Sequence, residues 1–320
     1  MVCQTLSAPI YIYFAYIMSK FQKIYKRARK DVSYLGIRLI VMFFRLLPRR
    51  TALSFGSMLG RSAPVLFRKD YVLSVKHLSS AFGREKDENE IRLLARETFR
   101  HVAMNFVDVA RLQKMSMEEV KSVCIPHNLN LLKDTIAQGH GVIGLTSHTG
   151  CWELLGVYLA AVGIPIAVVA RRLYDPRLED MLLVTRIRGG MKNISRGQDT
   201  RDIIRALKKG YLLGVLVDQD TNVKGDFVNF FGRPAHTATA PAILSLRYKS
   251  PILPIFTFRD EKHRHHICIG TPVEIQTTED FNNDVLLLTA KCSLVTERFI
   301  RDHPEQWVWF HRRWKTKKLT

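Results

Sequence analysis

His148 and Glu153 are the residues whose types and spacing best suit chemistry, because they follow the apolar stretch Val142–Thr146 and stand on either side of Gly150. An imidazole can accept a proton from a hydroxyl group, and a neighbouring carboxylate fixes its tautomer and stabilises the imidazolium. If His148 leaves a strand and Glu153 lies in the first turn of the next helix, a fold back at Gly150 brings the two side chains together. The spacing therefore predicts a general base pair, and a positioned base typically contributes ~10²–10⁴ in rate.

Two other interpretations of these residues stay open. His148 can simply end a strand, while Glu153 supplies the negative charge that is favoured at a helix N-terminus. A zinc site made of His148, Cys151 and Glu153 lacks an evident fourth ligand, so the sequence predicts no metal site.

The elements that must position these residues are short apolar strands alternating with helices. We expect strands at Val142–Thr146, Pro165–Ala170, Tyr211–Val217, Ile252–Phe258 and His266–Gly270. We expect helices at Trp152–Val162, Pro176–Arg188, Asp202–Lys209, Thr239–Tyr248 and Asp280–Asp302. This alternation predicts an α/β fold with a mainly parallel central sheet flanked by helices. Functional groups gather beyond the carboxyl ends of such strands, which adds Asp218 and Asp220 to the candidate site.

The amino terminus carries two apolar segments among basic residues. Thr5–Met18 has no charge and is followed by a run of lysines and arginines, whereas Arg38 and Arg45 interrupt Tyr34–Leu47. Neither segment reaches the ~20 apolar residues of a spanning helix, and the order of charge and apolar residues is the reverse of a signal peptide. We expect residues 1–50 to form helices that lie in the membrane interface and anchor the chain on its cytoplasmic side. A buried helix of a soluble domain is the alternative.

The composition excludes a disordered polyelectrolyte, because 47% of the 320 residues are hydrophobic and only 24% are charged. Lys and Arg number 49 against 29 Asp and Glu, which gives a formal charge of +20. Such an excess indicates a polyanionic partner, which is a nucleic acid, an anionic membrane face or an acidic substrate. The five cysteines form no C-x-x-C pair and predict a reducing, cytosolic setting without a disulfide framework.

Several further motifs, taken in their order along the chain, resemble those of a known family. The stretch from His148 to Glu153 resembles the HX4(D/E) motif of glycerolipid acyltransferases, and its context resembles the lipid A biosynthesis late acyltransferases, the lauroyl and myristoyl transferases. The downstream blocks that match in the family's order are Val169–Pro176, Thr185–Arg188, Asp218–Asp220, Phe230–Ala235 and Pro304–Lys315. The resemblance covers the chain from about residue 35 onward, and it makes residues 51–320 the acyltransferase domain.

The resemblance implies transfer of a fatty acyl chain from an acyl carrier protein thioester, or from acyl-CoA, to a hydroxyl of a lipid A precursor or related glycolipid. His148 would remove the hydroxyl proton and Glu153 would orient its ring. The expected partners of the oxyanion and the acceptor phosphates are Arg171, Arg186 and Arg188. No metal and no bound cofactor is required, and the expected location is the inner membrane.

Three further assignments depend on context. Asp218 is expected to hold an arginine or the acceptor sugar, with Asp220 beside it. Phe230 and Phe231 are expected in a loop, where they line an acyl-chain groove or touch the bilayer, or instead pack in the core. The segment His311–Lys315 interleaves basic and aromatic residues, a pattern that suits a membrane interface and also nucleic acid.

Two other functions stay open. The first is acyl transfer to another acceptor, namely a lysophospholipid, an ornithine lipid or a mannosylated inositol lipid. The second is nucleic-acid binding, which the charge alone favours and which no nucleic-acid-binding motif supports; we expect no nucleic-acid partner.

Overall fold

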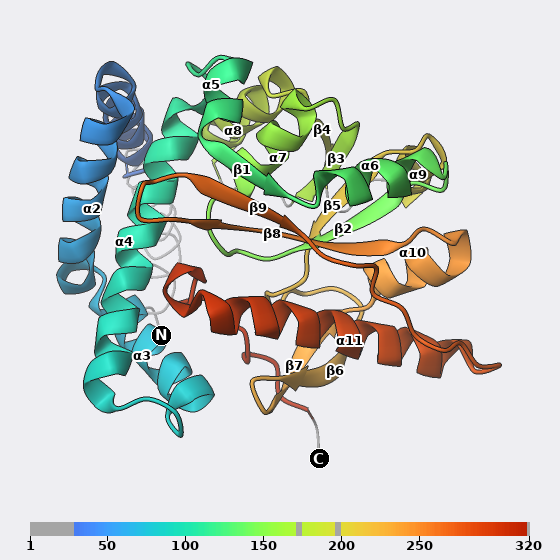
Figure 1. Ribbon diagram of the computed structural model, residues 1–320. Coiled ribbons are helices and arrows are strands. Elements are labelled where there is room, and N and C mark those ends of the chain that lie inside the picture. The colour runs from blue at the N-terminus through green and yellow to red at the C-terminus, as the bar shows by residue number, and fades with distance from the viewer. Residues whose placement is uncertain (1–28, 171–174, 196–199, 319–320) are drawn as a thin grey trace, which may run out of the picture.

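A seven-stranded sheet in the order β1-β9-β8-β2-β5-β3-β4 forms the centre of the molecule (Figure 1). The structure is a computed structural model, and it describes residues 29–170, 175–195 and 200–318. The sheet strands are β1 (Cys124–His127), β2 (Val142–Thr146), β3 (Ile166–Ala170), β4 (Lys192–Ser195), β5 (Leu212–Leu216), β8 (Ile252–Arg259) and β9 (His265–Ile269). All neighbouring pairs are parallel except β8 and β9. The predicted α/β fold with a mainly parallel sheet is confirmed.

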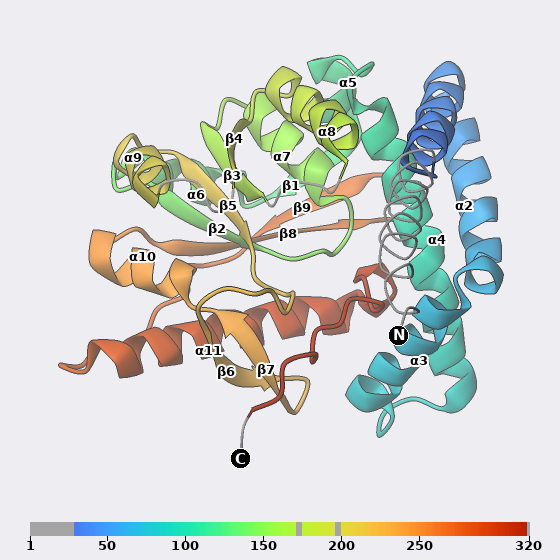
Figure 2. The same ribbon diagram turned by 180° about the vertical axis from the view of Figure 1, so that it is seen from behind.

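Helices cover both faces of this sheet (Figures 1 and 2). Helix α5 (Met117–Ser122) precedes β1. The helices that follow β1, β2, β3 and β4 in turn are α6 (Leu129–Ala137), α7 (Trp152–Ala161), α8 (Pro176–Arg188) and α9 (Thr200–Lys208). Two more, α10 (Ala240–Tyr248) and α11 (Phe281–Asp302), precede and follow the β8–β9 hairpin, and the short 3₁₀ helix η1 (Pro304–Gln306) comes after α11.

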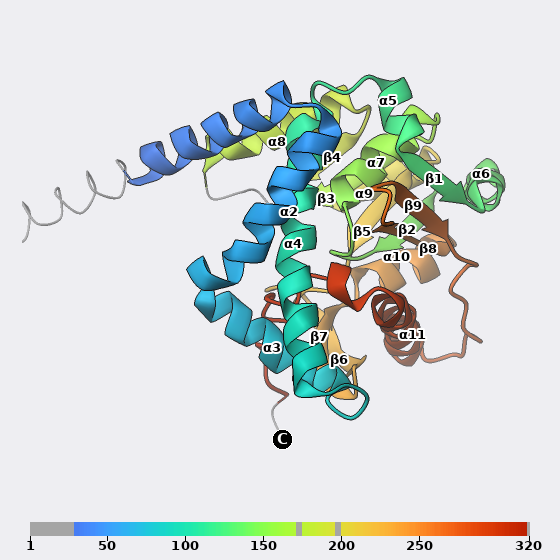
Figure 3. The ribbon, with the colours of Figure 1, turned by 60° about the vertical axis from the view of Figure 1, so that its left-hand side comes forward.

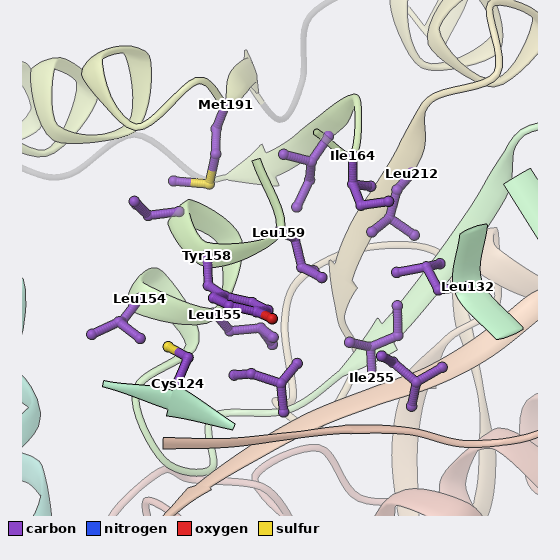
Figure 4. Packing of buried hydrophobic residues seen from close by; sticks show 14 of the residues in the cluster. Cys124, Leu132, Leu154, Leu155, Tyr158, Leu159, Ile164, Met191, Leu212 and Ile255 are labelled. Carbon is purple, nitrogen blue, oxygen red and sulfur yellow. The ribbon is translucent and has the colours of Figure 1, made fainter. Parts of the chain in front are cut away.

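The two faces have separate apolar cores, because strands buried on both sides present alternate residues to each layer. On one face Leu155, Tyr158 and Leu159 of α7 pack with Leu212 and Ile255 of the sheet (Figure 4). On the other face the side chains of α9, α10 and α11 form the second core.

A group of amino-terminal helices lies at one end of the sheet (Figure 1). It consists of a helix over residues 29–46 of the described chain, α2 (Arg49–Leu66), α3 (Arg68–Phe82) and α4 (Glu88–Leu112). Helix α4 begins at a capping box, in which Asp87 and Glu90 each accept a hydrogen bond from the other's backbone N–H. Val41 and Phe44 of the first helix pack with residues of α2 and α4.

The predicted membrane-anchoring segment is only partly described. Thr5–Met18 lies outside the described residues. Within the described chain, no helix is both long enough and apolar enough to cross a membrane. The interfacial location of residues 1–50 and the division of the chain at residue 50 stay predictions.

The segment around Phe230 is a strand rather than the expected loop. Strand β6 (Gly225–Phe230) pairs with β7 (Arg233–Ala238) as an antiparallel hairpin outside the main sheet. The hairpin packs against α11 (Figure 2). This local antiparallel pairing supplies the backbone hydrogen bonds of a segment that the sequence alone left without partners.

Candidate active site

His148 lies in a tight loop directly beyond the carboxyl end of β2. The loop depends on Gly150, whose φ is 58° and whose missing Cβ would collide with the carbonyl oxygen of Thr257. The Gly150 N–H donates to the carbonyl of Gln306 at 3.1 Å, and the side-chain amide of Asn105 donates to the Gly150 carbonyl at 2.7 Å. The loop is therefore held from both sides, by α4 and by the segment after α11.

The carboxylate that contacts His148 is Asp218. The His148 ring donates from Nδ1 to Asp218 Oδ1 at 2.8 Å, and its backbone N–H donates to Oδ2 at 2.8 Å. Trp307 Nε1 also donates to Oδ2, at 2.7 Å. Sheet register explains the contact, because Thr146 of β2 lies opposite Leu216 of β5, and His148 and Asp218 each follow two residues later.

Asp218 is fully buried, so its charge needs these donors. Burial alone would raise the pKa of the Asp218 carboxyl, but the His148 charge and the hydrogen bonds from His148 and Trp307 outweigh it and lower the pKa. A carboxylate held ionised at Nδ1 leaves Nε2 of His148 as the proton acceptor.

Glu153 does not occupy the predicted place beside His148, which corrects the sequence interpretation. Its oxygens accept from Arg186 Nε at 2.9 Å and from Arg186 Nη2 at 2.5 Å. Arg186 also donates from Nη1 to Asn193 at 2.9 Å. Glu153 and Arg186 are both 9% exposed, and a buried carboxylate is best satisfied by a bidentate guanidinium. Burial alone would lower the pKa of Arg186, but the hydrogen bond and charge of Glu153 raise it.

His148, Glu153 and Arg186 share one cavity of about 590 Å³. They line it together with the side chain of Gln219, whereas most of the remaining wall is apolar. That wall includes Gly144, Leu155, Leu159, Val168, Leu212 and Gly214. The two glycines lie opposite each other in β2 and β5, and their lack of side chains leaves room on this part of the sheet. The cavity has the size of a ligand pocket, with polar groups at the histidine and an apolar wall suited to hydrocarbon.

Asp220 and Arg188 make no hydrogen bond to His148 within the described residues. Asp220 accepts hydrogen bonds from the backbone and hydroxyl of Thr316, and its side chain is buried. Arg188 is exposed at the end of α8. Arg171 lies outside the described residues.

Phe230 and Phe231 are core residues, which confirms the core packing that the sequence left open and excludes them from the lining of the cavity. Their side chains are 1% and 4% exposed and pack in an aromatic cluster with Trp307, Trp309 and Trp314. Within His311–Lys315, Arg313 and Trp314 are buried, whereas Arg312 and Lys315 are exposed, so the aromatic side chain of this segment serves the core and its surface contact stays a prediction. Aromatic residues bury large apolar areas, and here they hold the carboxyl-terminal segment beneath the site.

Two polar residues of the site were missed by the sequence interpretation. Gln219 stands between the two predicted aspartates, and its side chain approaches His148 Nε2 to 3.0 Å. His311 lies with its ring centroid 5.0 Å from that of His148. Their only sequence signal was their place inside two family blocks that were assigned to other roles.

We expect loss of either partner of the Glu153–Arg186 pair to destabilise the fold strongly. Glu153→Ala leaves the buried guanidinium of Arg186 without its carboxylate, and Arg186→Ala leaves the buried carboxylate of Glu153 without its guanidinium. Each variant should therefore lose about 3–5 kcal/mol of unfolding free energy. Thermal and denaturant unfolding of the purified chain measure this loss. Glu88→Ala removes the exposed partner of Arg92 and serves as the matched control, for which little change is expected. Equal stabilities of the Glu153 and Glu88 variants would contradict the importance of the buried pair.

Comparison with known proteins gives a consistent family assignment. Residues 18–316 match the family described as bacterial lipid A biosynthesis acyltransferase. The chain is 25% identical over 306 residues to the lipid A biosynthesis palmitoleoyltransferase of Escherichia coli (strain K12), covering 94% of this chain and 96% of the relative. It is 24% identical over 302 residues to the lauroyltransferase of the same organism, with 94% and 96% covered. For the myristoyltransferase the identity is 23% over 303 residues, with 93% and 91% covered.

Proposed function

Since the chain belongs to the bacterial lipid A biosynthesis acyltransferase family, we propose that it moves a fatty acyl chain from an acyl carrier protein thioester to a hydroxyl of a lipid A precursor. The observation that carries this proposal is the His148–Asp218 pair at the polar part of a largely apolar cavity. A hydroxyl needs a base to become a nucleophile at neutral pH, and an acyl chain needs an apolar wall.

In the proposed reaction His148 Nε2 accepts the proton of the acceptor hydroxyl as its oxygen attacks the thioester carbonyl carbon. The new carbon–oxygen bond forms, the carbon–sulfur bond breaks, and the leaving thiolate takes the proton back from the imidazolium. Asp218 keeps the ring in the required tautomer and stabilises the imidazolium that forms. Glu153 and Arg186 build the neighbouring wall, and we retain Arg171 and Arg188 as contacts for acceptor phosphates.

The test of this function is a reconstituted transfer reaction. The purified full chain in mixed micelles receives a radiolabelled acyl carrier protein thioester or acyl-CoA, with a lipid A precursor that lacks a secondary acyl chain. The expected result is a precursor heavier by one acyl group, with faster transfer from the carrier protein. Mass spectrometry of lipids from a deletion strain gives the same answer in cells. If the deletion strain instead lacks an acyl chain on an ornithine lipid or a phospholipid made from a lysophospholipid, the proposed acceptor is wrong. If the purified chain transfers no acyl group to any lipid, the proposed function is wrong.

We also propose that the amino-terminal helices bind the cytoplasmic face of the inner membrane. Thirteen of the twenty-one exposed large hydrophobic side chains of the described chain lie between Val32 and Phe67. Residues 29–69 contain nine basic residues and a single acidic one, Asp31. Figure 3 shows the helix over residues 29–46 extending beyond the rest of the molecule. An exposed apolar surface with basic residues fits an anionic bilayer.

A triple variant tests the membrane contact. Leu39→Ser, Met42→Ser and Leu46→Ser together remove three exposed apolar side chains, and we expect at least about tenfold weaker partitioning because each buried side chain contributes about 1.5–3 kcal/mol. Flotation with phosphatidylglycerol vesicles measures it. The control replaces Leu287 and Leu294 of α11, which are similarly exposed on another element. Equal flotation of the two variants would contradict the proposal that these helices bind the membrane.

A further inference from the structure

The ring nitrogen of His148 that must accept the proton is already occupied by a side chain. Asp218 accepts a hydrogen bond from the N–H of Nδ1, so Nε2 carries a lone pair, and the amide nitrogen of Gln219 lies 3.0 Å from it. An amide N–H therefore donates to the base before any substrate is present. The Gln219 side chain also lines the cavity, so this donor stands where a hydroxyl has to arrive.

A second imidazole holds the other side of this amide. The Gln219 nitrogen lies 2.7 Å from Nδ1 and 3.0 Å from Nε2 of His311, and the rings of His311 and His148 are perpendicular with centroids 5.0 Å apart. Burial, with a smaller effect from the His148 charge, lowers the pKa of His311 to about 4. His311 is thus neutral at pH 7 and can accept a hydrogen bond from the amide.

Arg186, the one of the three expected arginines that lines the cavity in the described chain, is committed elsewhere. Arg186 donates to both oxygens of Glu153 and to Asn193. A neutral amide donor at the base is therefore better placed for the carbonyl oxygen of a thioester, because that oxygen lies next to the attacking hydroxyl. Donors fixed in advance at such a position stabilise an oxyanion without reorganisation.

We propose that Gln219 is a catalytic residue that caps His148 Nε2 in the resting enzyme and donates to the thioester oxyanion once the acceptor hydroxyl replaces it at Nε2. The inference rests on the proposed function. During attack the hydroxyl proton passes to His148 Nε2, and the carbonyl electron pair becomes the oxyanion that accepts the Gln219 N–H. When the carbon–sulfur bond breaks, the carbonyl re-forms and the thiolate takes the proton. His311 is a positioning residue that aims the amide.

The experiment is a kinetic comparison of Gln219→Ala with Gln138→Ala, a control at an exposed glutamine. The purified full chain is assayed in mixed micelles with an acyl-CoA or an acyl carrier protein thioester. Loss of one oxyanion donor is expected to lower kcat by about 10²–10³-fold with KM for both substrates nearly unchanged. Gln219→Glu, which places an acceptor near the oxyanion, should lose at least as much. Thermal unfolding of the variants excludes a loss of fold as the cause.

A double-variant cycle tests the positioning role of His311. His311→Ala should lower kcat about tenfold, and its effect should vanish when Gln219 is already alanine, because His311 acts through the amide. His311→Asn should recover part of the rate, since its side chain can still hold Gln219. Additive losses would contradict this coupling.

Failure of the inference is distinguishable from failure of the function. If His148→Ala is inactive while Gln219→Ala is as fast as the parent, only the oxyanion role is overturned. A faster Gln219→Ala enzyme, or one with raised KM and unchanged kcat, overturns it as well. Full activity of His148→Ala would overturn the proposed function itself.

Discussion

Alanine at position 148 is expected to lower kcat by about four orders of magnitude, since it removes the group that takes the hydroxyl proton and returns it to the leaving thiolate. The His148 side chain reaches the cavity from a loop held by backbone contacts, so its loss should leave the loop in place. Asp218 loses one donor and keeps the backbone N–H of residue 148 and Trp307 Nε1, so we expect a lower stability but a folded chain. KM for the acyl donor should change little, because the apolar wall that receives the chain is untouched.

The measurement is acyl transfer under single-turnover and steady-state conditions, together with thermal unfolding. The matched control is His140→Ala, an exposed histidine in the loop before β2. A His148→Ala enzyme that transfers at even a tenth of the parental rate would exclude the imidazole as the base.

Asparagine at position 218 is expected to cost nearly as much, about 10⁴-fold in kcat, through the tautomer of His148. Two N–H groups, from the His148 backbone and from Trp307, converge on Oδ2, so the asparagine oxygen must face them. The asparagine NH₂ then lies at the Oδ1 position and donates to Nδ1. The ring hydrogen moves to Nε2, and the base loses its lone pair.

Two measurements separate this effect from a loss of fold. Nitrogen NMR of the labelled His148 ring should show Nδ1 protonated in the parent and Nε2 protonated in Asp218→Asn. Asp220→Asn is the matched control, because that carboxylate bonds Thr316 instead of the base; we expect lower stability and a rate within about tenfold of the parent. Similar rates for the two asparagine variants would contradict a special role for Asp218.

Local sequence patterns predicted the elements of this protein well. Pro176–Arg188 is helical with the predicted bounds, because Asp175 caps its N-terminus and Pro176 suits the first turn. Tyr211–Val217 is confirmed as a strand, shortened by one residue at each end. The helix cap and the apolar run are each made by residues that are neighbours in the chain, which is why the sequence alone predicts both elements.

Contacts between distant residues were not predictable in this way. His265 comes soon after two exposed residues of a turn in the sequence, yet it is fully buried and lies 2.9 Å from Asp108 of α4. The Trp-rich segment after α11 has an interfacial composition, but it packs into a core made by Phe230 and Phe231. The composition of a segment suits several environments, such as a membrane interface or a protein core. Its packing against another part of the chain decides which of them it occupies.

The sequence by itself determined the family, the alternation of strands and helices, and His148 as the group at a strand end that can do chemistry. Only the tertiary structure decided which carboxylate accepts the hydrogen bond from the His148 ring. Glu153, five residues away, was carried by the first turn of α7 to a buried guanidinium, whereas Asp218, seventy residues away, was brought to the ring by the register of β2 against β5. Register depends on how the sheet packs between its two layers of helices, and no local spacing along the chain encodes that arrangement.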